Sequence, residues 1–126
     1  FALDVDGILQ ALDATTKIVF ICSPNNPTGQ SMARKDIERV CRETAGRALV
    51  VIDEAYHEYA SGGHYLDLRK RYEHVVLLRT LSKFGLAGVR LGYMIAPVAL
   101  LRPRTNSILG ATPSACAIVV LTPLPV

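Results

Sequence analysis

The sequence predicts an α/β fold in which helices flank a mainly parallel sheet, and three observations lead to this prediction. Short apolar runs of strand length alternate with stretches of helical periodicity, which is the pattern of β-α-β units. Clusters of turn-forming residues, or a helical pattern, separate each apolar run from the next. Half of the 126 residues are apolar and 20% are charged, which is typical of a folded globular domain.

The expected elements follow one another from the first residues to residue 96. Helical patterns lie at 4–12, 31–45 and 65–73, and apolar runs lie at 17–22, 48–52, 74–79 and 91–96. The helix at 31–45 is the best defined, because its apolar residues recur at i, i+4, i+7 and i+8. It also offers an ion pair of Glu38 with Arg42, and Gly46 is its stop signal. From Pro103 onward the periodicity is lost.

Charge and cysteine content limit the classes of function. The net charge of +3 comes from 14 basic and 11 acidic residues spread along the chain, so nothing favours nucleic acid or a membrane surface as a partner. The longest apolar runs are too short to span a membrane. Cys22, Cys41 and Cys116 lie far apart, which indicates reduced thiols of a cytoplasmic protein. The three histidines share no metal-ligand spacing, so we expect no metal site.

Polar residues of different kinds follow three of the predicted strands. Asn26 lies in the turn after the first strand, Asp53 ends the second, and Thr80, Ser82 and Lys83 follow the third. Ligands of open parallel sheets bind outside the carboxyl ends of the strands, so these residues are expected at one edge. Singly, they could be a turn residue, a helix cap and an exposed lysine. An acidic pair after an apolar strand would also suit a P-loop ATPase, but residues 1–52 contain no G-x-x-x-x-G-K-[ST] loop.

Taken together, three motifs in this order resemble the class I and II aminotransferases, which are fold-type I pyridoxal-phosphate enzymes. They are S-P-N-N-P-T-G at 23–29, V-I-D-E-A-Y at 51–56, and R-T-L-S-K at 79–83 with the glycine-rich stretch 85–92. Their wording looks closest to histidinol-phosphate aminotransferases. The resemblance implies that residues 1–101 are part of the cofactor-binding large domain and that residues 102–126 are a divergent or truncated tail. Because family members are much longer, the chain is expected to be a fragment.

The resemblance assigns roles around the cofactor ring. Lys83 would be the catalytic residue and would bind pyridoxal 5′-phosphate covalently, which requires an amine. Asp53 would form an ion pair with the protonated ring nitrogen and so favour the charged form. Asn26 and Tyr56 would donate hydrogen bonds to the phenolate oxygen of the ring.

The resemblance also assigns the ligands of the cofactor phosphate. Thr80 and Ser82 would supply hydroxyls, and Arg90 would supply a forked cation. The seven-position step from Lys83 to Arg90 is one residue shorter than in many members, although the histidinol-phosphate group has a similar short form. Glu54 is expected to have a structural role near the site, and Tyr59 to be a packing or loop residue.

The leading functional hypothesis is transamination of histidinol phosphate with 2-oxoglutarate, giving imidazole acetol phosphate and glutamate in histidine biosynthesis. The full-length protein would be a homodimer with an amino donor and a 2-oxo acid as its small-molecule partners. The 126-residue chain itself is expected to be inactive, because the small domain and an upstream glycine-rich segment are missing. An aromatic or aspartate aminotransferase, a threonine-phosphate decarboxylase and a ligand-sensing domain of a transcription regulator remain alternatives.

Overall fold

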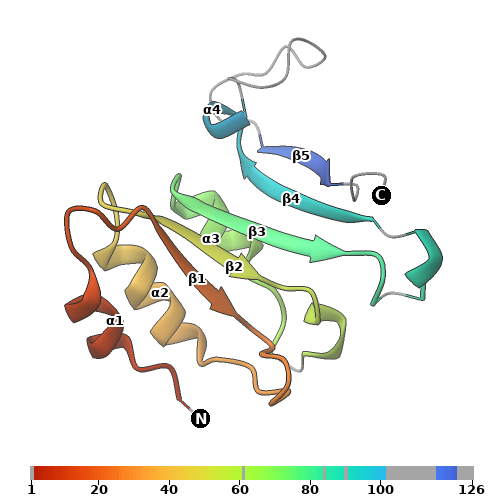
Figure 1. Ribbon diagram of the computed structural model, residues 1–126, viewed down its shortest axis with the longest axis horizontal. Coiled ribbons are helices and arrows are strands. Elements are labelled where there is room, and N and C mark those ends of the chain that lie inside the picture. Colours follow the sequence, from red (N-terminus) through yellow and green to blue (C-terminus); the bar gives the residue numbers. More distant parts are fainter. Residues whose placement is uncertain (1, 61, 84, 90, 102–115, 122–126) are drawn as a thin grey trace.

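The computed structural model describes residues 2–60, 62–83, 85–89, 91–101 and 116–121. Within these ranges, five strands form one sheet in the order β1-β2-β3-β4-β5 (Figure 1). The strands are β1 (Ile18–Cys22), β2 (Leu49–Asp53), β3 (Val75–Thr80), β4 (Gly92–Pro97) and β5 (Cys116–Leu121). β1, β2 and β3 are parallel, whereas β4 and β5 each run antiparallel to the preceding strand. The predicted α/β class, with helices flanking the sheet, is confirmed.

The helices are α1 (Val5–Ala11), α2 (Arg34–Glu43), α3 (Leu66–Arg71) and α4 (Val98–Leu101), with short 3-10 helices η1 (His57–Tyr59) and η2 (Ala87–Val89). Helices α1, α2 and α3 begin and end near the expected residues, whereas α4 and the two short 3-10 helices were not predicted. Asp4 caps α1, because its carboxylate accepts the N–H of Gly7 at 2.9 Å. Gly46 follows α2 with a φ of +74°, a left-handed conformation that ends a helix and favours glycine.

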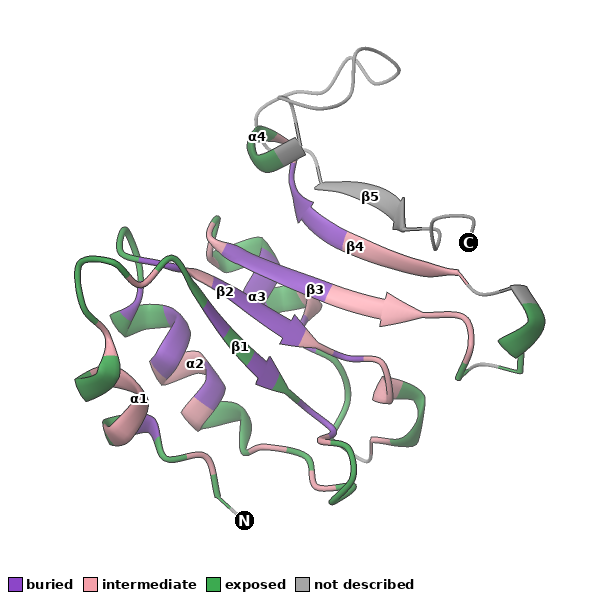
Figure 2. Ribbon diagram, in the orientation of Figure 1, coloured by how far each residue is buried: buried purple, intermediate pink, exposed green. Residues whose placement is uncertain are grey.

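The main core lies between one face of the sheet and helices α1, α2 and α3 (Figures 1 and 2). The crossovers β1-α2-β2 and β2-α3-β3 step along the sheet in the same direction, and crossovers of one hand then place both helices on the same face. Ile37 and Val40 of α2 and Leu68 of α3 are fully buried there. They pack against alternate strand residues such as Ile52 and Leu77.

The opposite face of the sheet carries a much smaller cluster. Val51, Val76 and Ala96 are buried on it. On β1, which alternates between exposed and buried residues, Ile18 and Phe20 are 47% and 63% exposed. The residues of β1 that point away from the helices are therefore uncovered in this chain.

Two details differ from simple expectation. Within the described residues, Glu38 pairs with Arg71 on α3 and Arg42 pairs with Glu43, so the expected pairing of Glu38 with Arg42 was wrong. The pair across two helices forms because α2 and α3 pack side by side on the sheet. β4 also reverses direction, since its connection to β3 through residues 81–91 is too short for a parallel crossover.

Much of the predicted tail, 102–115 and 122–126, lies outside the described residues, so its divergence from the family stays a prediction. The segment between these ranges is β5, whose residues pair with β4 from Cys116 opposite Pro97 to Leu121 opposite Gly92. In the part of the chain that is described, no helix is long and apolar enough to cross a membrane.

Candidate active site

The carboxyl ends of β1, β2 and β3 meet at one edge of the sheet. Cys22 at the end of β1 is in register with Asp53 at the end of β2, and Asp53 is in register with Leu78 of β3. The turn after β1, the segment after β2 and the loop after β3 therefore start side by side. These three connections carry the residues singled out from the sequence.

Asn26, Tyr56 and Lys83 come together at this edge from three different connections. The Asn26 side-chain amide donates to the Tyr56 hydroxyl at 3.3 Å. The Lys83 Nζ lies 5.0 Å from the centroid of the Tyr56 ring, within the range of a cation–π contact. Because the Tyr56 hydroxyl accepts from Asn26, its own hydrogen is free to donate to a ligand. The group offers an amine and two neutral hydrogen-bonding side chains.

Asp53 is partly buried, like Tyr56, whereas Asn26 and Lys83 are exposed. One oxygen of its carboxylate accepts the N–H of Ala55 at 2.9 Å, which fixes the side chain at the end of β2. The pKa of the Cys22 thiol, on the neighbouring strand, is raised by burial first and by the negative charge of Asp53 second. The structure thus presents a positioned carboxylate at the same edge as Asn26 and Tyr56.

The predicted phosphate ligands are arranged by the loop that follows β3. The Thr80 hydroxyl donates to the Leu91 carbonyl at 3.1 Å and accepts the Ser82 N–H at 3.1 Å. The hydroxyl hydrogen of Thr80 is therefore already used in a bond within the loop. To donate to a phosphate, the hydroxyl would have to give up its bond to the Leu91 carbonyl. Arg90, the predicted forked cation, lies outside the described residues.

A buried ion pair joins Glu54, which follows β2, to Arg79 of β3, and the sequence did not predict it. Glu54 is fully buried, and its Oε2 accepts from the Nε of Arg79, whose side chain is 12% exposed, at 2.7 Å. Burial opposes the charge on Arg79, but the hydrogen bond and charge of Glu54 outweigh it, so the pKa of Arg79 lies above its ordinary value. The only signal in the sequence is a charged residue near the end of each of two adjacent apolar strands.

The same glutamate connects the edge to two further segments. Its Oε1 accepts the N–H of Tyr65 at 2.7 Å. The Tyr65 hydroxyl lies 3.0 Å from the hydroxyl of Ser23, which in turn accepts the N–H of Met32 at 2.9 Å. Ser23 begins the turn that contains Asn26, and Glu54 follows Asp53. This buried network therefore ties together the connections that carry the candidate site residues.

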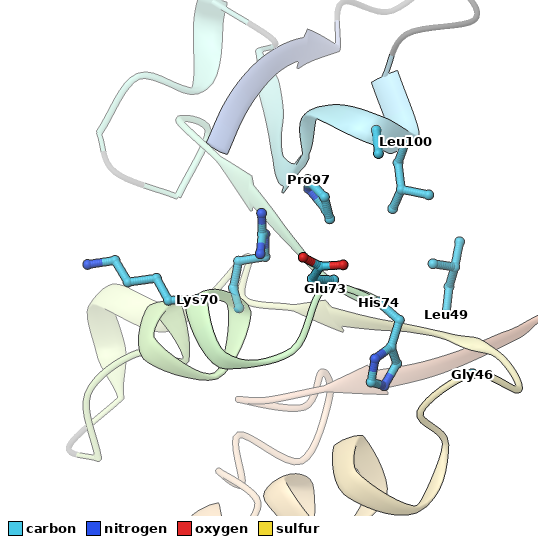
Figure 3. A pocket seen from close by; sticks show the side chains of 9 residues that line it. Gly46, Leu49, Lys70, Glu73, His74, Pro97 and Leu100 are labelled. Atoms are coloured by element: carbon cyan, nitrogen blue, oxygen red, sulfur yellow. The ribbon is translucent and has the colours of Figure 1, made fainter. Parts of the chain in front are cut away.

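Two described cavities lie at opposite ends of the strands. A cavity of about 170 Å³ is lined by the turn at 24–29 together with Tyr56 and Tyr59. A larger one, of about 540 Å³, lies beside the amino-terminal ends of β2 and β3 and the end of β4 (Figure 3). In Figure 3, Lys70 extends away from Pro97 and Leu100, which line this larger cavity. The larger cavity is therefore remote from Asn26, Tyr56 and Lys83, and the smaller one belongs to the candidate site.

Comparisons with known proteins give relatives for most of the chain. The sequence profile described as "Aminotransferase class I and II" matches residues 1–118. A histidinol-phosphate aminotransferase of Photobacterium profundum is 52% identical over 95 residues, which are 75% of this chain and 25% of that protein. An aromatic amino acid aminotransferase of Rhodococcus opacus is 46% identical over 99 residues, 77% of this chain and 28% of that protein.

A solved structure shows a similar fold. An aspartate aminotransferase of Thermus thermophilus, a double mutant, superposes with a TM-score of 0.73 at 28% identity, over 81% of this chain and 28% of that one. The chain therefore spans about a quarter of the length of the proteins that it matches. The three relatives are named for three different substrates, although each matches most of this chain.

Proposed function

Because this chain belongs to the class I and II aminotransferase family, we propose that it forms part of the cofactor-binding core of a pyridoxal-phosphate-dependent aminotransferase. The family depends on pyridoxal 5′-phosphate in general. One observation supports the proposal most directly: the Asn26 amide, the Tyr56 hydroxyl and the Lys83 amine lie together at the carboxyl edge of parallel strands. This is where α/β sheets bind ligands.

The described side chains suit this cofactor chemically. Its aldehyde requires an amine, and Lys83 is exposed at the site and free to react. Its phenolate oxygen requires neutral donors, and the Tyr56 hydrogen is available because Asn26 already donates to the Tyr56 oxygen. Its ring nitrogen requires a fixed carboxylate, and Asp53 is held by the N–H of Ala55.

In the proposed mechanism, each of these residues has a separate task. When bound, pyridoxal 5′-phosphate supplies a conjugated ring that accepts electrons from the amino acid. Lys83 would hold the cofactor through its amine and, once that amine is free, would serve as the general acid and base that carries a proton at the substrate Cα. Asp53 keeps the ring nitrogen protonated through an ion pair. Asn26 and Tyr56 hold the phenolate oxygen in its anionic form.

We assign the phosphate to Ser82, Thr80 and Arg90, with the guanidinium of Arg90 as a two-pronged donor. Ser82 follows the Thr80 turn, and its backbone N–H is already oriented by the Thr80 hydroxyl. In this proposal the Thr80 hydroxyl exchanges its bond to the Leu91 carbonyl for one to the phosphate.

For the substrate, we propose histidinol phosphate as amino donor and 2-oxoglutarate as acceptor, in a cytoplasmic homodimer of the full-length protein. Support comes from the histidinol-phosphate aminotransferases among the relatives, which are 44–52% identical to the chain. The aromatic amino acid aminotransferase at 46% identity supports the second candidate, an aromatic donor. A panel of phosphorylated, aromatic and acidic amino donors, assayed with the full-length protein, separates the two.

Titration with pyridoxal 5′-phosphate tests the cofactor site itself. We expect the 126-residue chain to develop the absorbance band of a lysine-bound cofactor, and Lys83→Ala to lack it. Lys17→Ala is the matched control, because Lys17 lies before β1 at the other end of the strand and the described bond of its amine is to the Ala14 carbonyl. A band that survives in Lys83→Ala, or no band in the full-length protein, contradicts the proposal.

A further inference from the structure

Tyr59 contacts the backbone of the predicted catalytic lysine, although its place in the sequence suggests only a packing or loop residue. Its hydroxyl donates to the Lys83 carbonyl at 2.8 Å. Tyr59 is 70% exposed, so burial of its ring does not explain its position. Among the described contacts of its side chain, the hydrogen bond to Lys83 is the polar one, and a Tyr56–Tyr59 ring contact is the other.

Tyr59 and Tyr56 belong to one turn that holds Lys83 at two points. Tyr56 precedes the short helix η1 and Tyr59 ends it, and the Tyr59 N–H bonds the Tyr56 carbonyl at 3.0 Å. Their ring centroids are 6.3 Å apart. Tyr59 binds the carbonyl of Lys83, while the Tyr56 ring lies beneath its ammonium group. The turn thus contacts Lys83 both at its backbone carbonyl and at the amine that ends its long, flexible side chain.

Among the described residues, few other hydrogen bonds restrain the loop that carries Lys83. The Leu81 N–H bonds the Leu91 carbonyl at 2.9 Å, and the Ser82 N–H bonds the Thr80 hydroxyl. Those two bonds precede Lys83, and the Leu86 N–H bonds the Leu81 carbonyl at 3.3 Å across it, so the Tyr59 hydroxyl makes the described hydrogen bond to Lys83 itself. The Lys83 side chain is exposed. Without the Tyr59 hydroxyl, the Lys83 carbonyl would lose its described partner within the turn that the Leu86–Leu81 bond closes, and a small rotation of the Lys83 backbone moves the distant Nζ by a large distance.

We propose that Tyr59 is a positioning residue for Lys83: its hydroxyl holds the Lys83 carbonyl so that the amine stays over the Tyr56 ring. This inference rests on the proposed function of Lys83 as the residue that captures pyridoxal 5′-phosphate. Tyr59 acts through Lys83 and needs no contact with the cofactor. Its removal should therefore slow capture of the cofactor by Lys83 without weakening the initial binding of the cofactor.

The test measures capture of pyridoxal 5′-phosphate by Lys83 in the 126-residue chain, using borohydride reduction and peptide mass spectrometry. The rate at rising cofactor concentration gives a limiting rate and a half-saturating concentration. Tyr59→Phe removes only the hydroxyl, and we expect its limiting rate to fall about two- to tenfold, the factor that one hydrogen bond supplies. The half-saturating concentration should not change. Amide hydrogen exchange at Leu81 and Ser82 should become faster, because the loop loses its anchor.

Tyr72→Phe is the matched control, since the Tyr72 ring packs against the main core and contacts His74, near the start of β3 at the other end of that strand. It should capture the cofactor at the unchanged rate. A raised half-saturating concentration in Tyr59→Phe would mean a direct ligand contact, and a reduced amplitude at unchanged rate would mean only a loss of folded protein. Either result overturns the inference, as does a rate equal to that of the parent chain.

Failure of the proposed function gives a different result. If Lys83 does not bind the cofactor, the parent chain itself shows no selective modification of Lys83 over its other lysines. The exchange of Leu81 and Ser82 still reports whether the Tyr59 hydroxyl anchors the loop, so unchanged exchange in Tyr59→Phe overturns the inference in that case too.

Discussion

Replacing Glu54 by Gln should destabilise the chain far more than the same change in an exposed ion pair. Gln keeps the size of the side chain and can still accept the N–H of Tyr65, but it carries no charge. Arg79 would then remain charged with no carboxylate beside it, because Glu54 is its described ion-pair partner and Tyr93 makes a smaller contribution. The perturbation therefore isolates the charge of one buried carboxylate.

The magnitude follows from the burial of both partners. Glu54 is fully buried and the Arg79 side chain is 12% exposed, so water can do little to compensate the lost charge. Removing one partner of a buried ion pair costs about 3–5 kcal/mol, and we expect the low end because Gln retains neutral hydrogen bonds. About 3 kcal/mol lowers the ratio of folded to unfolded chains roughly a hundredfold.

Urea unfolding followed by far-ultraviolet circular dichroism measures this difference in the free energy of unfolding. The matched control is Glu38→Gln, which removes a carboxylate from the more exposed pair with Arg71 and should cost less than about 1 kcal/mol. Replacing both Glu54 and Arg79 by Met should recover part of the loss, since no unpaired charge remains, although the Tyr65 N–H then loses its acceptor. The reasoning is refuted if Glu54→Gln and Glu38→Gln lower the free energy of unfolding equally.

Three further changes test other parts of the structure. Gly46→Ala should cost about 1 kcal/mol in urea unfolding because Gly46 has a φ of +74°, whereas Gly62→Ala, at a glycine without positive φ, should cost less; equal losses would contradict the left-handed turn. Hydrogen bonds from the two threonines that follow Asp13 lower its pKa from 3.8 to about 2, so it stabilises the fold above pH 4 and loses this effect as the pH falls through 2. Asp13→Asn should therefore flatten the dependence of the free energy of unfolding on pH between about 4 and 2, and an unchanged slope would argue against those bonds. Iodoacetamide should alkylate Cys22 faster in Asp53→Asn, because the Asp53 charge helps to raise the thiol pKa; a slower reaction, read by peptide mapping, would exclude that coupling.

Much of the fold could be predicted from local patterns. The apolar runs became β1 to β4 and the periodic stretches became α1 to α3, each within a few residues of the expected bounds. These elements are decided by periodicity, capping residues and turn formers, all of which act over a few positions. Asp4 as the cap of α1 and Gly46 as the end of α2 are examples, because both act on backbone groups next to them in the chain.

The site was predictable in part for the same reason. The order of Asn26, Asp53 and Lys83 after three strands, together with parallel pairing, is enough to place them at one edge. Their assigned roles in cofactor binding stay predictions. What the sequence did not reveal is how the residues are held: Tyr59 bonds a carbonyl 24 residues away, and Glu54 pairs with a side chain 25 residues away.

The sequence by itself thus determined the α/β class, the family, and the residues that meet at the carboxyl edge. Only the tertiary structure decided the reversed direction of β4, the pairing of Glu38 with Arg71 instead of Arg42, and the buried bond between Glu54 and Arg79. The physical reason is the separation along the chain of the residues that each feature involves. Periodicity, caps and motifs are properties of neighbouring residues, whereas an ion pair or a loop anchor depends on which side chains the packed strands and helices bring within about 3 Å of each other.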